Sequence, residues 1–599
     1  MTLIAATLLV AIACGGSDAV EPTQQAQEPP TAAPPATSVP PTSVPTAIPE
    51  QAGQTFTFPA VPDWVAKGKY QPMVFQGLNG FNPGQWDLHS CGSLATCLTP
   101  SSLRFNGLVF HDPNEPVEII CDLCESWEVS PDGTSYTFNL LKANWHDGEP
   151  VTATDIKFSL DRIVDPDAIR SRTGAMKTFY ERGSAEIVNE STIMVPIKFP
   201  GPLFIINLSS EYMKMYPKHA TENLTPDEAT TANGLLGSGA WRLKNFEPQV
   251  SIEYEKNADY FKEGRPFFDG MLFTIVRDIN RRFAALQVGQ VFSTAGPAIG
   301  TYGVADTLRV QAETDGRVRA IMNKDAFTTS MVLHSNKPPF DDPRMRRAVF
   351  LAIDRNELTD IVRCGGDFGC LGSPMTFFPR IGGFDVEPAD ELATVPGWRA
   401  DKTEDIAEAK ALAAAAGYAD GMKLQINLSS AAATVTTAEV VAEQLETILG
   451  LEFTLNVMDR ASFGPRMRNG EDHISIASSS PLIPDPSDFL NQHYLTNTLK
   501  NPDNWTNPRL DEIIAEQAKE RDPAGRLELF REAVKILRQG EGHWVPVTWG
   551  YSGGLMDYRL QGFNIPELDQ TVKHWEGTWW DPDAVKPPCA SGALEGLSC

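Results

Sequence analysis

Apolar and polar residues alternate in two short runs between positions 126 and 140. Trp127 and Val129 alternate with polar neighbours in the first run, and in the second run, 136–140, every other residue is apolar. Residues 130–133 (Ser-Pro-Asp-Gly) suit a tight turn, because proline fixes its φ and glycine accepts a positive φ. The pattern predicts a β-hairpin with one buried face.

The hydrophobic period changes to that of a helix just after this hairpin. Residues 146–148 (His-Asp-Gly) suit a second turn, and Thr152 with Asp155 three residues later resembles a capping box with Asp in place of the usual Glu. Apolar residues then recur at helical spacing from Ile156 to Ile163, which predicts a helix with one face in the core. No nucleophile, base and orienting group fall together here, so we interpret the stretch as scaffold.

Longer helical patterns alternate with strand patterns further along the chain. Residues 251–255 alternate as a strand, and a helix predicted from about 405 to 416 ends at Gly417, a usual C-terminal stop. Another helix starts at Asn507-Pro508, as cap and first turn, and Asp522-Pro523 ends it and begins the next. This alternation predicts an α/β chain.

The N-terminus carries an export signal. The run "LIAATLLVAIAC" is apolar, has the length of a signal peptide and is too short to span a bilayer as a stable anchor. Small residues before Cys14 and Gly15 after it resemble a bacterial lipoprotein cleavage site, with Cys14 as the lipidated residue. Ala11 stands where such sites usually have Leu, and no Lys or Arg precedes the run, so an ordinary signal peptide and a start codon upstream both stay open.

Residues 15–53 are rich in Pro, Thr and Ala and have almost no apolar bulk. Such a segment cannot bury enough surface to fold, and we expect a disordered, extended linker. At ~3.1 Å per residue in polyproline form it reaches roughly 100 Å. A lipid anchor followed by this linker predicts a globular part held off a membrane surface.

Charge excludes one class of partner. The 599 residues include 77 acidic and 50 basic side chains, for a net charge of -27, which repels phosphate backbones and anionic lipid head groups. Nucleic-acid binding is therefore not expected. A hydrophobic content of 42% is enough for several ordinary domains with a large core.

Eight cysteines remain once Cys14 is set aside, and they fall in close sets. Outside the cytoplasm such neighbours indicate disulfides, although a zinc or redox site at Cys121 and Cys124 is the alternative. No His pair lies near that CxxC, which makes zinc the weaker interpretation. The four cysteines from 91 to 124 allow three pairings. The disulfide candidates are Cys91, Cys97, Cys121, Cys124, Cys364, Cys370, Cys589 and Cys599.

Several blocks, in order along the chain, carry a resemblance to a known family. They are "LCESWEVSPDGTSYTFNLLKANWHDGEPVTATDIKFSLDRI" and the blocks 237–261, 336–358, 405–428 and 507–537. Together they resemble the family-5 extracellular solute-binding proteins, the dipeptide, oligopeptide and nickel receptors of bacterial ABC importers. The resemblance spans about residues 70 to 565, and Ser238 and Ala240 depart from the family's G-T-G-P-Y segment.

The resemblance implies an α/β fold of the periplasmic-binding-protein type: a two-lobed clamp with an extra domain, in three parts. Crossover strands near 325 and 546 would form the hinge, and closure around a solute would give the form that an importer recognises. The implied signal segment is 1–14 and the implied linker is 15–53. Domain I would consist of 54–90, 203–325 and 546–599, the last with the C-terminal tail. Domain II would be 91–202 and domain III 326–545.

In this family the ligand lies buried between the lobes, held by a few polar groups. Four segments of this chain match those that line the cleft in the family. The first comes after the first strand, the second just before the turn at 146–148, the third is 478–486 and the fourth is at the second hinge strand. The tryptophans could equally be core residues. The implied ligand-binding candidates are Asn82, Trp86, Trp145, Ser479, Ser480, Leu482, Asp485, Thr548 and Trp549.

One candidate departs from the peptide-binding members of the family. These carry an Asp four residues before the Pro of an Asp-Pro or Glu-Pro pair, and it pairs with the peptide's α-amino group. Here that position is Leu482, whereas Asp485, just before Pro486, is expected to be a turn residue. A buried ammonium needs an acidic partner, and Leu482 cannot supply one, so the peptide anchor is missing at this position. A neutral solute such as an oligosaccharide is therefore an alternative.

The sequence therefore predicts an extracytoplasmic, membrane-anchored receptor that binds a peptide-like or oligosaccharide-like solute and works with ABC permease subunits as a monomer. No catalytic residue, cofactor or metal site is expected, because the nine histidines are scattered and neither G-x-S-x-G nor H-E-x-x-H occurs. A surface sensor or adhesion protein on the same fold, or a secreted hydrolase, are the rival hypotheses.

Overall fold

The computed structural model describes residues 74–79, 82–91, 94–112, 118–168, 173–294, 304–364, 377–378, 384–418, 421–496, 498, 500–540, 542–562 and 573–586. Cys14, the linker 15–53, Cys370, Cys589, Cys599 and the side chain of Cys364 lie outside the described residues, and so do the predictions made for them.

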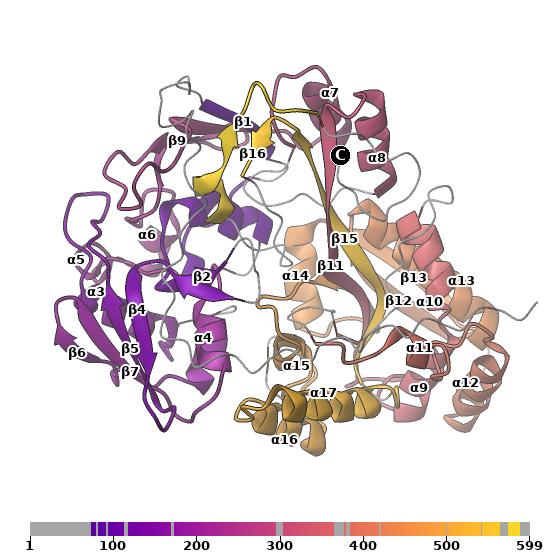
Figure 1. Cartoon of the computed structure of the whole chain (residues 1–599). Coiled ribbons are helices and arrows are strands. Elements are labelled where there is room, and N and C mark those ends of the chain that lie inside the picture. Colours follow the sequence, from indigo (N-terminus) through magenta and orange to yellow (C-terminus); the bar gives the residue numbers. More distant parts are fainter. Residues whose placement is uncertain are drawn as a thin grey trace, which may run out of the picture. The chain divides into compact units, whose positions relative to one another are not determined.

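A four-stranded sheet, here called the N-terminal sheet, joins segments far apart in the sequence (Figure 1). β1 runs parallel to β10, and the other pairs are antiparallel. The strand predicted at 251–255 is confirmed as β9. The strand order is β1 (Val74–Asn79), β10 (Gly270–Ile275), β9 (Ser251–Lys256) and β8 (Trp241–Glu247).

A second four-stranded sheet, here called the hairpin sheet, contains the predicted hairpin. Its order is β4 (Cys124–Val129), β5 (Ser135–Leu140), β7 (Thr192–Pro196) and β6 (Glu186–Asn189), all antiparallel. Trp127 is buried, but the prediction was wrong for Val129, whose side chain is 42% exposed. Val129 lies beside the turn at the end of an edge strand, where little can cover it.

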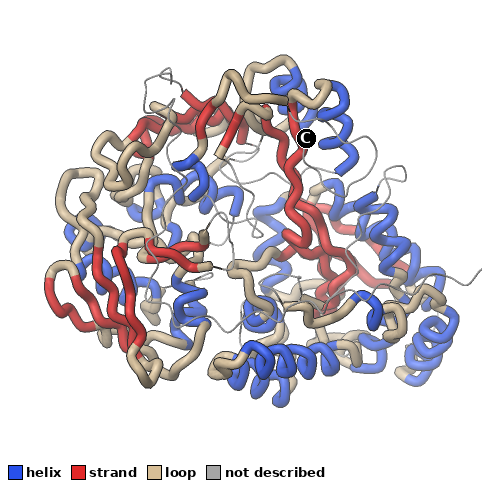
Figure 2. The backbone as a smooth tube through the Cα atoms, viewed as in Figure 1, coloured by secondary structure: helices blue, strands red, loops and turns tan. Residues whose placement is uncertain are grey.

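A five-stranded sheet, here called the C-terminal sheet, is built from strands in the second half of the chain, and Figure 2 shows its strands in red with helices around them. Its largest core cluster includes residues of β12, β14 and β15 with Val349 and Phe350 of α9 (Pro343–Ala352). The strand order is β13 (Glu452–Met458), β12 (Lys423–Ser429), β14 (Ile474–Ser479), β11 (Val318–Leu333) and β15 (Trp544–Asp557).

Helices complete the architecture. The first half of the chain contains α2 (Thr99–Ser101), α3 (Ala153–Ile163), α4 (Leu203–Leu208), α5 (Lys218–Thr221), α6 (Pro226–Thr230), α7 (Ile279–Gln287) and α8 (Val304–Glu313). The second half contains α9, α10 (Arg355–Thr359), α11 (Ala389–Leu392), α12 (Thr403–Ala415), α13 (Ala432–Leu449), α14 (Arg460–Arg468), α15 (Ser487–His493), α16 (Pro508–Gln517) and α17 (Pro523–Leu537).

The predicted helix ends are largely confirmed. Asn507 and Asp522 cap α16 and α17 with side-chain oxygens that accept backbone N–H groups, and Pro508 and Pro523 follow in the first turns. The carboxylate of Asp155 accepts the backbone N–H of Thr152 at 2.9 Å, which is half of the predicted capping box of α3. These ends form because the caps satisfy donors that have no partner within the helix.

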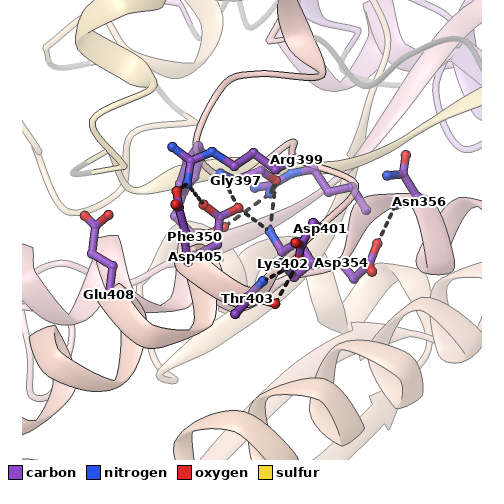
Figure 3. A network of polar contacts seen from close by, with 12 residues as sticks. Phe350, Asp354, Asn356, Gly397, Arg399, Asp401, Lys402, Thr403, Asp405 and Glu408 are labelled. Atoms are coloured by element: carbon purple, nitrogen blue, oxygen red, sulfur yellow. Dashed lines mark hydrogen bonds and ion pairs between the residues drawn. The ribbon is translucent and has the colours of Figure 1, made fainter.

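Helix α12 starts two residues earlier than predicted, within a polar network (Figure 3). Lys402 donates to the buried carboxylate of Asp405 at 2.9 Å, and the same carboxylate accepts the backbone N–H of Gly397 at 2.9 Å. Gly417 follows the helix with φ +83°, which a glycine adopts without strain. The network fixes the first turn of α12 against the preceding loop.

β11 and β15 form a long antiparallel ribbon that connects the C-terminal sheet to the N-terminal sheet. The pairing runs from Val318–Asp557 to Val332–Trp544, with a break between Asn323 and Phe327. Beyond the break, Ser293 bridges β15 at Met556 to β1 at Gly77. Two segments therefore cross between the sheets, as the resemblance implied for the hinge, while the domain boundaries stay a prediction.

One of the three possible pairings of the four cysteines from 91 to 124 is present, and it has two disulfide bonds. The structure joins Cys91 to Cys97 and Cys121 to Cys124. The second bond follows the small pair of β2 (Val109–His111) and β3 (Ile119–Cys121), and another small pair joins β16 (Leu560–Gln561) to β17 (Trp579–Trp580). Both bonds close short loops within the first half of the chain.

Candidate functional site

The strands of the C-terminal sheet bring three predicted site residues together. Thr328 of β11 pairs with Ser479 of β14 on one side and with Trp549 of β15 on the other. Thr548 is fully buried next to Trp549, whose ring lies 5.3 Å from that of Phe489. These residues form one polar and aromatic row at the point where β14 ends.

The serines at the end of β14 are only partly available to a ligand. Oγ of Ser479 is buried, lies 2.9 Å from Nε2 of His493 and accepts a hydrogen bond of 2.6 Å from Nζ of Lys500. Ser480, the next residue, is half-buried. The Ser479 hydroxyl is therefore already engaged by α15 and the segment after it, and Ser480 offers the more open hydroxyl of the two.

Asp485 forms a buried ion pair. Its two carboxylate oxygens each accept a hydrogen bond of 2.8 Å from Arg526 of α17, and both side chains are under 5% exposed. Oδ1 also accepts the backbone N–H of Ser487 at 2.9 Å, so the turn role expected of Asp485 is present as well. A bidentate, buried ion pair of this kind fixes the segment against α17, so the carboxylate of Asp485 is already occupied and does not bind a ligand.

Leu482 and Ile483, in the same segment, contact residues of the first half of the chain. The backbone N–H of Leu482 donates to Asp488 at 2.7 Å, and its side chain packs on the cluster that contains Phe105 and Tyr216. Ile483 is 2% exposed in the core cluster of the hairpin sheet. The position of the missing peptide anchor is thus filled by an apolar contact between the two halves of the chain.

The candidates near the N-terminal sheet are held by local contacts. Oδ1 of Asn82 accepts the backbone N–H of Gln249 at 2.7 Å. Trp86 is buried, with its ring 5.1 Å from that of Phe246 and 5.2 Å from the guanidinium of Arg104. These contacts place Trp86 in the core cluster of that sheet.

Trp145 belongs to the core of the hairpin sheet. Its side chain is 1% exposed, and Nε1 donates to Asp155 at 3.3 Å, next to the capping contact of α3. The structure therefore brings Ser479, Thr548 and Trp549 together and places Trp86 and Trp145 in two other cores. Their ligand contacts stay a prediction.

Sequence reasoning did not single out the buried charges. Lys262 donates to Asp122 at 2.8 Å and to Glu576 at 2.7 Å, and Tyr260 donates to the same Glu576 at 2.5 Å. Burial alone would lower the pKa of Lys262, but the two carboxylates outweigh it and raise the pKa. A buried charge can be suspected from sequence where a charged residue lies within an apolar run, and Arg104 in "SLRFNGLVF" is such a case.

The described residues contain neither a metal-binding cluster nor a membrane-spanning helix. No group of three or more His, Cys, Asp or Glu side chains there could hold a metal ion. None of the helices within the described ranges has the length and apolarity to cross a membrane.

The family model of bacterial extracellular solute-binding proteins, family 5 (middle part), matches residues 118–501. A curated relative is the probable di/tripeptide-binding protein 5 of Pseudomonas aeruginosa. It is 24% identical over 515 residues, which cover 81% of this chain and 91% of the relative.

Solved structures have the same fold. Haemophilus influenzae OppA in complex with the peptide RPPGFSPFR has a TM-score of 0.73 and 21% identity, and the match covers 85% of this chain and 99% of OppA. AgaA of A. tumefaciens, in complex with agropinic acid, has a TM-score of 0.70 and 22% identity, with coverage of 85% and 99%. The two-lobed α/β fold that the sequence implied is therefore confirmed.

Proposed function

Because the chain belongs to the bacterial extracellular solute-binding proteins, family 5, we propose that it is the solute receptor of an ABC importer. It closes on one solute and delivers it to a permease. The family and the relatives are binding proteins rather than enzymes, so the hydrolase hypothesis has no support from them.

The observation that carries this proposal is the β11–β15 ribbon. Two strands connect the sheets, and their pairing breaks between Asn323 and Phe327. A hinge of few residues absorbs the backbone rotation of closure, so that solute binding shifts an open–closed equilibrium.

The solute is a peptide or an oligosaccharide. Curated relatives named as peptide-binding proteins favour the first class. Leu482 favours a solute without a buried ammonium at that place, because its side chain cannot balance a positive charge. A peptide bound here has its amino group paired elsewhere.

The remaining features complete the proposal. Cys14 carries a lipid, residues 15–53 hold the receptor off the extracytoplasmic face of the membrane, and the receptor acts as a monomer on domains with the boundaries given above. Gel filtration of the detergent-purified chain and mass spectrometry of its N-terminal peptide test these points.

A thermal-shift screen of the full chain in mild detergent tests the function. The probes are di- and tripeptides, neutral oligosaccharides and nickel chelates. A solute at 100 times its Kd adds roughly 2.7 kcal/mol to the free energy of unfolding, which gives a clear, saturable shift. Saturable shifts with one class support the receptor, whereas turnover of peptide, ester or glycoside substrates would contradict it.

A further inference from the structure

Arg104 is a buried guanidinium that has no acidic partner among the described residues. It ends the turn Ser102–Arg104 after α2, and its side chain is 4% exposed. Nη1 donates to the carbonyl of Ala232 at 2.6 Å, but Nε and Nη2 have no hydrogen-bond partner within the described part of the chain. A guanidinium has five N–H donors, and leaving them unmet away from water is costly.

The groups that face Arg104 do not neutralise it. Its guanidinium lies over the rings of Trp86 at 5.2 Å and Phe105 at 5.0 Å. Burial raises the pKa of Tyr216 and of Tyr254, so both phenols stay protonated at neutral pH. Burial also lowers the pKa of Arg104 to about 10, which still leaves the guanidinium charged at neutral pH.

Further buried polar groups without a partner lie in the same part of the chain. The hydroxyls of Thr99 and Ser101, in the helix just before Arg104, have no partner among the described residues, and neither has Nε1 of Trp241. Trp241 belongs to the same core cluster as Trp86, and Tyr254 of that cluster donates to the carbonyl of Pro100. All of these unmet groups can donate a hydrogen bond.

We infer that this donor cluster binds a carboxylate group of the solute, with Arg104 as the ion-pair partner and Trp86 packed against the guanidinium. A planar carboxylate fits the Nε and Nη2 edge of a guanidinium with two hydrogen bonds. The inference rests on the proposed function and narrows it to solutes that carry a carboxylate group. The carboxylate belongs either to a peptide C-terminus or to a sugar acid.

Acetate serves as the first probe, because it is the carboxylate without the rest of the solute. At fixed ionic strength, acetate raises the melting temperature of the full chain, whereas acetamide, which has the same shape and no charge, does not. Arg104→Met abolishes the acetate shift, and Arg104→Lys keeps part of it. Arg531→Met, on the exposed face of α17, is the matched control for the lost charge and keeps the full shift.

Calorimetry with paired probes identifies the source of the carboxylate. Trialanine is compared with its C-terminal amide, and trigalacturonate with the neutral trisaccharide. The acid of one pair binds at least tenfold more tightly than its partner without a carboxylate, and this preference disappears in Arg104→Met. An acetate shift that survives in Arg104→Met, or no acetate shift in the parent chain, overturns the inference.

These results separate the inference from the proposed function. Saturable binding of neutral solutes in the screen, without any effect of acetate, overturns the carboxylate site and leaves the receptor intact. An acetate effect that depends on Arg104, with no solute bound in the screen, overturns the receptor and leaves the site intact. Circular dichroism of each variant confirms that it is folded.

Discussion

Two buried arginines, Arg526 and Arg104, lie in opposite electrostatic surroundings. Arg526 meets Asp485 with two hydrogen bonds of 2.8 Å and also donates to the side chain of Gln517 at 3.0 Å. Arg104 meets one carbonyl, two rings and no carboxylate within the described residues. Both side chains are about equally buried, at 3% and 4% exposure.

The presence or absence of an acidic partner indicates a structural role for Arg526 and a role in binding for Arg104. A buried pair that satisfies itself holds two segments of the chain together, here 485 and α17. A buried charge that the chain leaves unmet weakens the fold, and such groups are retained mainly where they act on something outside the chain. Opposite effects of mutation on stability are therefore expected at the two positions.

Asp485→Asn is expected to give the largest effect. It removes the carboxylate and leaves Arg526 buried without a partner charge, so the free energy of unfolding falls by about 3 to 5 kcal/mol. Urea denaturation measures the change. The double variant Asp485→Leu with Arg526→Met recovers most of the loss, because neither charge remains. A double variant as unstable as the single one would mean that packing, not charge, holds this segment.

A third arginine extends the comparison to pH. Arg162 of α3 binds Asp87 with two hydrogen bonds of 3.0 and 2.9 Å. Burial would raise the pKa of Asp87, but Arg162 outweighs it and lowers the pKa from 3.8 to about 2. Since the folded pKa is the lower one, the pair stabilises the fold fully above about pH 4, and about 2 kcal/mol is lost as pH falls towards 2.

Denaturation of the parent chain and of Asp87→Asn between pH 5 and pH 2 checks this window. The difference in stability between the two chains shrinks as the pH falls. A difference that stays constant across the window would show that Arg162 does not lower the pKa of Asp87.

Arg104→Met is expected to act in the opposite direction to Asp485→Asn. It removes an unpaired buried charge, keeps the apolar stem, and raises the free energy of unfolding by about 1 to 2 kcal/mol. The same urea experiment, without added anions, measures the gain. A loss as large as that of Asp485→Asn would erase the contrast between the two arginines.

Asp522→Ala supplies the smallest effect and the reference for the first prediction. Asp522 caps α17, the helix that carries Arg526, by accepting the N–H groups of Ala524 and Gly525. Loss of such a cap lowers the free energy of unfolding by about 1 kcal/mol. If Asp485→Asn lowers the free energy of unfolding no more than Asp522→Ala does, the ion pair contributes no more to stability than a helix cap.

Sequence reasoning predicted elements whose signals are local. The hairpin at 126–140 and the caps at Asn507 and Asp522 follow from turn chemistry and side-chain reach over two to four residues. Val129 escaped this reasoning because its exposure depends on which strand lies at the edge of the sheet, and that is a property of the whole sheet.

The candidate site was less predictable for the same reason. The partner of Asp485 is 41 residues away, and Ile483 packs in a cluster drawn from residues 108–215 and 518. The sequence shows Arg104 only as a charge within an apolar run, because its burial and its missing partner depend on residues 86, 105 and 232 together. Only the assembled fold shows which charges are balanced.

The ribbon also dictates the order in which the protein can assemble during its synthesis. Thr328 of β11 bonds to Thr548 of β15, 220 positions later, and Met556 supplies the strand edge on which Ser293 closes the bridge to β1. A growing chain therefore has to reach β15 before the ribbon can pair. Contacts this distant in sequence form slowly, so pairing of the ribbon is expected to be a late step in folding.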